Sequence, residues 1–305
     1  MFLDVFSQVI ILLLLILIGF VLTKGHILTE QGSKSMTDMV LTIVTPCVII
    51  KSFMREYDPS LLKNLLIAFL IAFLCHLGFI LLGHLFLRDR DIAKQKVLQY
   101  GVVFSNCGFM SLPLQESIVG DMGVFYGSSY IAIFNLFVWS YGITMMSGNR
   151  KYMTPKKLII NPGIIGLTIG LIIFLFSIPT PEIINKTVSY VASLNTPLPM
   201  IIIGYHLANS NILDGIKNWK CLFAIALRLF IFPLLALAVM YICGIRGDML
   251  ISSIISCSAP VAAITTMFAA KFGRDTSLSV NLVSLSTILS LISMPLLITL
   301  TKYIA

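Results

Sequence analysis

Charged side chains are scarce in this chain of 305 residues, since Asp, Glu, Lys and Arg together make up 11% of it. An ordinary soluble domain has about 25%. Long polar stretches are also lacking, because hydrophobic runs recur from Val5 to Ile304. The apolar fraction is 58% and the mean hydropathy is +0.98. These deficits exclude a soluble domain held by a single anchor, and they indicate an integral membrane protein with many spans.

Signatures of catalysis are absent as well. The sequence contains no GxSxG, HExxH or GxGD motif and no pair of carboxylates deep within a hydrophobic run, which argues against an intramembrane enzyme. It has no Walker A loop and no domain to carry one, so an ATP-driven pump is excluded. The six cysteines fall in apolar segments without CxxC spacing, and we interpret them as small buried hydrophobes. We therefore expect neither a metal nor a cofactor.

Hydrophobic runs long enough to cross a membrane, which takes about 20 residues in a helix, recur along the whole chain. The connections between them are short, and the longest polar linker, 147–157, lies at the midpoint. The first run is interpreted as a retained helix because no basic region precedes it and no small-residue cleavage site follows it. The sequence predicts an all-α integral membrane protein with ten spans, at 5–23, 35–54, 62–87, 97–119, 123–147, 160–178, 183–208, 219–243, 248–270 and 276–300.

Basic residues are distributed unevenly between the two ends of these spans. Loops at one end carry Lys24, Lys34, Arg88, Arg90, Lys94, Lys96, Arg150, Lys151, Lys156, Lys157, Lys217, Lys220, Lys271 and Arg274. The other end carries only Lys51, Arg55, Lys63, Lys186, Arg246 and Lys302. The positive-inside rule places the richer end in the cytoplasm, so we expect a multi-pass protein of the cell membrane with both termini outside. The net charge of +8 then reflects cytoplasmic loops, and no nucleic-acid partner is expected.

Two of the predicted spans contain helix-breaking residues at the depth of the hydrocarbon. The fourth span holds Asn106, Gly108 and Pro113, and the ninth holds the segment Ser256–Pro260. Hydrocarbon offers no partner to the backbone groups that such breaks release, so they persist only where protein buries them or where they line a wet cavity. Interruptions in corresponding places of two halves point to the binding site of a transporter.

The two halves of the chain are related by a weak repeat. Five spans on each side of the midpoint make an odd number, so the second half has to enter the membrane inverted relative to the first. Landmarks recur at an offset near 151 residues, with Thr45-Pro46 answered by Thr196-Pro197. We therefore predict two inverted five-helix repeats, at 1–147 and 159–305, joined by a cytoplasmic linker at 148–158. Such repeats form transporter sites at their interface.

The fourth span supplies the first candidates for substrate contact. Asn106 offers an amide donor and acceptor, and Gly108 lets a ligand approach the backbone closely. Asn106 could also cap a half-helix, and the two roles are compatible. Pro113 and Pro260 each lack an N–H and free a carbonyl in the preceding turn. Their joint occurrence, beside the Asn-Cys-Gly segment, favours a site over two ordinary kinks.

Asn135 and Arg228 each allow two interpretations. An amide deep in a membrane helix either belongs to a site or bonds a neighbouring helix. A charged side chain at the helix centre costs about 2.5–3.5 kcal/mol on insertion scales, so Arg228 has to face the protein interior. There it either attracts an anionic substrate or bonds the carbonyls that a broken helix frees.

Several short motifs, taken in their order, resemble the auxin efflux carrier family, which includes the PIN-type carriers of plants. They cover essentially the whole chain and comprise Thr45-Pro46 with Lys51-Ser52, Ser105–Phe109 with Leu112-Pro113-Leu114, Phe134–Trp139, Arg228 with Pro233, Ser258-Ala259-Pro260, and Leu285-Ser286-Thr287 with Met294-Pro295-Leu296. The long cytoplasmic loop of the plant members is much shorter in this chain, which argues against regulation through that loop and not against transport.

The resemblance implies a scaffold group (spans one, two, six and seven) and a transport group (the other six), with spans four and nine crossing where they unwind at their prolines. It also implies secondary transport of a small organic anion, and a homodimer formed through the scaffold. A dicarboxylate such as malate or malonate is expected ahead of an auxin-like monocarboxylate. A membrane sensor with a transporter-like fold is the alternative. The candidate substrate-binding residues are Asn106, Cys107, Gly108, Pro113, Asn135, Arg228, Ser258, Ala259 and Pro260.

Overall fold

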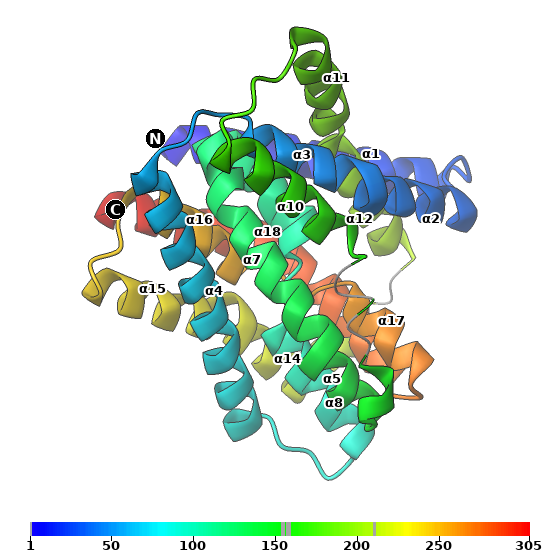
Figure 1. The fold of residues 1–305 in the computed structure, drawn as a ribbon. Helices are drawn as coiled ribbons and strands as arrows, with labels where there is room; N and C mark the ends of the chain where they lie inside the picture. The colour runs from blue at the N-terminus through cyan, green and yellow to red at the C-terminus, as the bar shows by residue number, and fades with distance from the viewer. Residues whose placement is uncertain (1, 154–155, 157–159, 210–211) are drawn as a thin grey trace.

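The protein is a bundle of helices, shown in Figure 1. The computed structural model describes residues 2–153, 156, 160–209 and 212–305, so residues 154–155 and 157–158 of the expected linker, Lys157 among them, lie outside the described residues. Within the described ranges every named element is a helix or a helical turn, and the one extended pairing is an isolated antiparallel bridge between Ser105 and Val261.

The α-helices of the first half are α1 (Phe2–Lys24), α2 (Glu30–Met39), α3 (Thr45–Phe53), α4 (Pro59–Phe86), α5 (Ile92–Val103), α6 (Leu112–Val119), α7 (Asp121–Phe137) and α8 (Ile143–Ser147). Those of the second half are α10 (Pro162–Leu175), α11 (Glu182–Ala192), α12 (Pro197–Ala208), α13 (Ile212–Lys217), α14 (Trp219–Ala226), α15 (Phe232–Ile242), α16 (Gly247–Ser258), α17 (Ile264–Lys271) and α18 (Thr276–Ile304). Wider π-helical turns join some of them, namely η1 (Val40–Val44), η2 (Cys107–Ser111), η3 (Val138–Gly142) and η6 (Leu227–Ile231), and short 3₁₀ turns are η4 (Arg150–Tyr152) and η5 (Ser193–Asn195).

Helical segments lie over each of the ten hydrophobic runs of the sequence. Among the described residues, the helices long and apolar enough to cross a membrane are six, at Glu30–Phe53, Pro59–Phe86, Asp121–Ser147, Glu182–Ala208, Trp219–Ile242 and Thr276–Ile304. Shorter apolar helices lie at Ile10–Lys24, Pro162–Leu175 and Gly247–Ser258. The chain is therefore an all-helical, multi-pass membrane protein. Its arrangement as ten spans in two inverted repeats goes beyond these lengths and stays a prediction.

A wider turn precedes three of the prolines that lie within helical runs. Pro46, Pro113 and Pro233 are each the second residue of an α-helix, and a π-helical turn of 5 residues leads into that helix. In the turn before Pro113, the N–H of Leu112 donates to the oxygen of Cys107. A proline ring clashes with the carbonyl four residues earlier, and a wider turn moves that carbonyl aside. The chain therefore stays helical through these prolines.

This result corrects one prediction about the broken spans. The fourth span unwinds at 104–106, ahead of η2, and not at Pro113 as expected. Pro113 is buried in a continuous helical run because the π-helical turn absorbs its clash. The ninth span unwinds at 259–263, which includes Pro260 as predicted.

Helices α1 and α12 pack with their backbones almost in contact. A Cβ at Gly19 would lie 2.2 Å from the oxygen of Ile201, and a Cβ at Gly204 would lie 2.1 Å from the oxygen of Ile16. Small residues allow such close approaches between membrane helices. In the same part of the molecule α3 packs on α10 and α11, while α7 packs on α4 and α16. In Figure 1, α1, α2 and α3 lie across the upper part of the molecule, below α11, and α4 and α7 run side by side down the centre.

Candidate functional site at two broken helices

The unwound segments of the two broken spans pair with each other. The N–H of Asn106 donates to the oxygen of Pro260 at 2.7 Å, and the N–H of Ala262 donates to the oxygen of Phe104 at 2.9 Å. These two bonds satisfy backbone groups that a membrane interior would otherwise leave without a partner. The pairing fixes the two breaks against each other, and we call the place where they meet the crossing.

Arg228 donates hydrogen bonds to backbone carbonyls beside both breaks. Its Nε donates to the oxygen of Ala259 at 3.0 Å, and its Nη2 donates to the oxygen of Cys257 at 2.8 Å. Its Nη1 donates to the oxygens of Val102 at 3.1 Å and Val103 at 3.5 Å. Arg228 thus binds carbonyls from the last turns of both α5 and α16, at the ends where those helices stop.

Of the two roles considered for Arg228, the structure shows the bonding of freed carbonyls. A helix that ends inside protein leaves its last carbonyls without intrahelical partners, and a guanidinium with its fork of donors satisfies several at once. The side chain is fully buried. No ion pair found among the described residues includes it. Its positive charge therefore remains beside the crossing without a balancing carboxylate, while direct contact with an anion stays a prediction.

A small cavity of about 30 Å³ lies next to the crossing. Residues from four parts of the chain line it: Asn106 and Phe109 from the first break and η2, Ala263 from the second break, Ile203, His206 and Leu207 from α12, and Val283, Ser284 and Thr287 from α18. Its walls combine apolar side chains with hydroxyl, amide and imidazole groups. This combination suits a small molecule with an apolar body and a few polar groups.

Two helix N-termini open onto this cavity. Asn106 is the N-cap residue of η2 and Ala263 is the N-cap residue of α17, and neither side chain bonds the N–H groups of the helix that it caps. The N–H groups of Cys107, Thr265 and Thr266 at these ends donate to the oxygens of Ser105, Ala262 and Ala263. The helix dipole places a partial positive charge at each end. A site between two such ends favours an anion without needing several formal charges.

Of the predicted substrate-binding residues, Asn106 is the one that lines the cavity. Within the described interactions its amide makes no hydrogen bond, so donor and acceptor are available there. Gly108 has no atom within 4 Å of where a Cβ would lie, so its backbone borders open space. Cys107 is buried, and the hydroxyl of Ser258 is bonded to the oxygen of Ile255 at 3.2 Å.

Ala259 and Pro260 contribute through their backbones, as partners of Arg228 and Asn106. Sequence reasoning did not identify His206, Ser284 and Thr287. Ser284 directly precedes the Leu285-Ser286-Thr287 motif and Thr287 is its last residue, but that motif was noted only for its resemblance. His206 lies on a span assigned to the scaffold, nine residues after Pro197.

Asn135 lies away from this cavity, between α7 and α10. Its Oδ1 accepts a hydrogen bond from Nδ2 of Asn161 at 2.9 Å, and its Nδ2 donates to the oxygen of Ile131 at 2.9 Å. Oδ1 of Asn161 also accepts from the N–H groups of Gly163 and Ile164 at the start of α10. Both ends of the Asn135 amide are therefore engaged, and the bond from Asn161 joins α7 to the start of α10, which is the second of the roles considered for Asn135.

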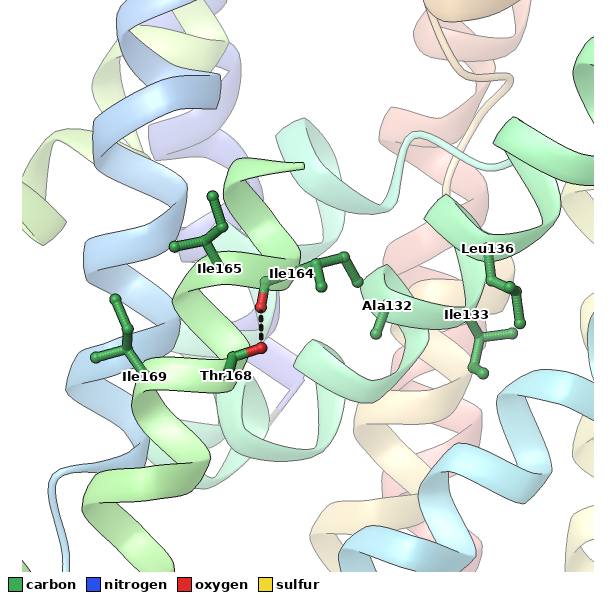
Figure 2. Close-up of a pocket in the computed structure, with 7 residues that line it drawn as sticks. All are labelled: Ala132, Ile133, Leu136, Ile164, Ile165, Thr168 and Ile169. Atoms are coloured by element: carbon green, nitrogen blue, oxygen red, sulfur yellow. Dashed lines mark hydrogen bonds between the residues drawn. The ribbon is translucent and has the colours of Figure 1, made fainter. Parts of the chain in front are cut away.

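A larger hollow of about 660 Å³ lies on the surface between α7 and α10 (Figure 2). Its lining is apolar apart from Thr168, whose hydroxyl donates to the oxygen of Ile164 at 2.8 Å. No polar group is left to orient a charged molecule, so we do not place the site there despite its size. The lining residues are Ala132, Ile133, Leu136, Ile164, Ile165, Thr168 and Ile169.

An ion-pair cluster joins α3 to α6 and α7 at a distance from the cavity. The ammonium of Lys51 lies 3.2 Å from a carboxylate oxygen of Glu116 and 3.3 Å from one of Asp121. The side chain of Lys51 is 29% exposed, so the pairs are partly shielded from solvent. These contacts hold the end of α3 against the end of α6.

Comparison with known proteins identifies related chains. The family model described as "Membrane transport protein" matches residues 4–157 and 149–298. An uncharacterized transporter of Methanothermobacter thermautotrophicus is 27% identical over 297 residues, which cover 95% of this chain and 96% of that protein. An uncharacterized transporter of Methanocaldococcus jannaschii is 24% identical over 296 residues, covering 93% and 94% respectively. Auxin efflux carrier component 1 of Arabidopsis thaliana is 29% identical over 124 residues, covering 39% of this chain and 20% of the carrier.

Proposed function

Because the chain belongs to the auxin efflux carrier family of membrane transport proteins, we propose that it is a secondary transporter that moves a small organic anion by alternating access. The substrate binds beside the crossing of the broken spans, α5–α6 and α16–α17. The protein performs no chemical step in this proposal; it changes the side of the membrane from which the anion is accessible.

The observation that carries the proposal is the convergence of two uncapped helix N-termini on one cavity. Asn106 and Ala263 precede those helices and both border the cavity. Arg228 adds a buried positive charge behind the breaks, bonded to carbonyls on both helices. Partial and formal positive charges thus gather at a place that hydrocarbon would otherwise make unfavourable for an anion.

The small volume of the cavity supports a site that admits substrate only when the helices around it move. About 30 Å³ accommodates roughly two water molecules, which is less than a dicarboxylate needs. One wall is α12 and the opposite wall is formed by the breaks and α18. The walls have to separate before a substrate enters, and α12 belongs to the group that we propose as scaffold. Movement of the broken helices against that scaffold would open the site to one side and then to the other.

The substrate is proposed to be a dicarboxylate such as malate or malonate, or an auxin-like monocarboxylate. Purified protein in proteoliposomes should take up at least one anion of a panel of radiolabelled malate, malonate and indole-3-acetate. Uptake should saturate and exceed that of liposomes without protein. Imposed proton or sodium gradients then report coupling and direction. Saturable binding of a panel member without uptake would favour the sensor alternative and refute transport.

We further propose a location in the cell membrane with both termini outside and with the two inverted repeats predicted above. A reporter that is active only outside the cell, fused after Ala305, should be active; activity of a cytoplasmic reporter there would overturn the ten-span topology.

We also propose a homodimer formed through the scaffold helices, supported by exposed apolar side chains of α10 such as Ile165, Ile169 and Ile172. A cysteine at Ile169 should form cross-linked dimers in membranes, whereas one at Leu81, exposed on α4, should not.

A further inference from the structure

Two basic residues occupy matching positions in the two halves of the chain. Pro46 lies at the start of α3 and Pro197 at the start of α12, and they are 151 residues apart in the sequence. The same spacing relates Arg55 to His206. The structure therefore repeats a helix that begins at a proline and ends near a basic side chain, once in each half.

Arg55 and His206 lie at opposite ends of the bundle. Lys24 at the end of α1, Glu30 at the start of α2 and Asn209 just after α12 border one surface pocket. His206, three residues before Asn209, is therefore at this end. The continuous helix Glu30–Phe53 has 24 residues, so its far end lies about 36 Å away at 1.5 Å per residue. Arg55 follows that far end directly.

His206 faces the cavity with its ring available. The residue is exposed, and it lines the cavity together with Asn106. Its ring contacts that of Tyr205, with 5.5 Å between the ring centroids. Across the described part of the chain, the imidazole makes no hydrogen bond. A ring N–H donor is therefore placed beside Asn106 and the two helix N-termini, where an anion would arrive.

Arg55 is packed under α7 instead of facing a cavity. Its Nη1 contacts the sulfur of Met122, and its guanidinium carbon lies 5.0 Å from the centre of the Phe125 ring. Its Nε is buried and finds no hydrogen-bond partner among the described residues. A buried guanidinium N–H without a partner is costly. The ion pairs of Lys51 with Glu116 and Asp121 hold this end of the molecule together.

We propose that Arg55 and His206 are paired anion-recognition residues, one at each mouth of the transport path. His206 receives the anion at the cytoplasmic mouth, and Arg55 receives it at the outer mouth. This inference rests on the proposed transport function and topology.

In this structure His206 borders the cavity, whereas Arg55 is covered by α7. Movement of α7 with the transport group would uncover Arg55 and supply its unpartnered N–H with a carboxylate. Arg228 cannot supply these hydrogen bonds to the anion as long as the crossing is preserved, because its donors are bonded to backbone carbonyls.

The proposal predicts that each substitution changes the half-saturating concentration for transport from one side of the membrane only. A purely structural role would change it for both sides. Transport of the panel anion that the wild type carries is measured in right-side-out and in inverted membrane vesicles. His206→Leu should raise the half-saturating concentration about tenfold in inverted vesicles, because one charge-assisted hydrogen bond is lost, and less than twofold in right-side-out vesicles. Arg55→Met should show the reverse. His206→Gln, which keeps an N–H donor, and Arg55→Lys, which keeps a cation, should restore most of the lost affinity.

Matched controls are available at each end. His84 is an exposed histidine at the cytoplasmic end of α4, and Arg246 is an exposed arginine at the outer end of the bundle in the proposed topology. His84→Leu and Arg246→Met should leave both half-saturating concentrations unchanged. Variants are compared only at equal amounts of folded protein, measured by size exclusion in detergent. Equal effects on both sides, or no effect on either side, would overturn the inference while transport stands. Absence of saturable uptake by the wild type would overturn the proposed function, and the inference with it.

Discussion

Substitution of Arg228 by Met tests whether the crossing of the broken helices depends on this one side chain. Methionine keeps much of the volume and removes every donor. Three of the hydrogen bonds lost are 3.1 Å or shorter, to the oxygens of Val102, Cys257 and Ala259. Each buried carbonyl left without a partner costs about 1–3 kcal/mol, so the variant should lose about 3 kcal/mol or more of its free energy of unfolding.

That loss is large beside the total stability of a folded domain, about 5–15 kcal/mol. Thermal unfolding of the purified protein in detergent should therefore shift downward by about 6 °C or more. Arg228→Lys should fall between the variant and the wild type, because one ammonium cannot span carbonyls at the ends of both α5 and α16. Arg246→Met is the control, since this exposed arginine bonds only the nearby oxygens of Tyr241 and Ile245.

If Arg228→Met unfolds at the wild-type temperature but binds the transported anion much more weakly, the side chain acts on the substrate and not on the backbone. If Arg228→Met loses both thermal stability and anion affinity, the Arg228→Lys variant distinguishes the two roles. Arg228→Lys with normal affinity but lowered thermal stability would support the role in bonding carbonyls.

The remaining predictions concern the cavity, the far ion pairs and one loop. Asn106→Ala should weaken anion affinity about tenfold in equilibrium binding, because a charge-assisted amide bond is lost; unchanged affinity in folded protein would move the site elsewhere. Lys51→Met removes partly exposed ion pairs, so amide hydrogen exchange at the end of α6 should rise about twofold to fivefold; unchanged exchange would show that those pairs do not hold that end closed. The ammonium of Lys220 donates a hydrogen bond to the carboxylate of Asp89 at 2.7 Å and lowers the pKa of that carboxyl. Stability from this pair is present above the ordinary pKa, about 3.9, and is lost as pH falls through the lowered value. Lys220→Met should therefore lower the unfolding temperature at neutral pH and have less effect below about pH 3, and an equal effect at both pH values would contradict the linkage.

Local properties of the sequence were sufficient for the helical class and for the place of most helices. Apolar runs of about 20 residues are a local signal, and helical segments lie over each of them. The family was also recognisable from short motifs in order, as the match over residues 4–157 and 149–298 shows. The ninth span unwinds where Pro260 predicts. These features depend on residues close together in the chain, and so the sequence alone determined them.

Only the tertiary structure decided how the breaks are used. Pro113 does not unwind its span, because a π-helical turn accommodates it, and the real break at 104–106 has no proline. Arg228 finds its acceptor at Val102, 126 residues away. His206 reaches the cavity of Asn106 from a helix whose own sequence carries no sign of a site. Each of these roles depends on a partner far away in the sequence. Apolar periodicity determines which residues form a helix, but it does not determine which carbonyl a buried donor bonds.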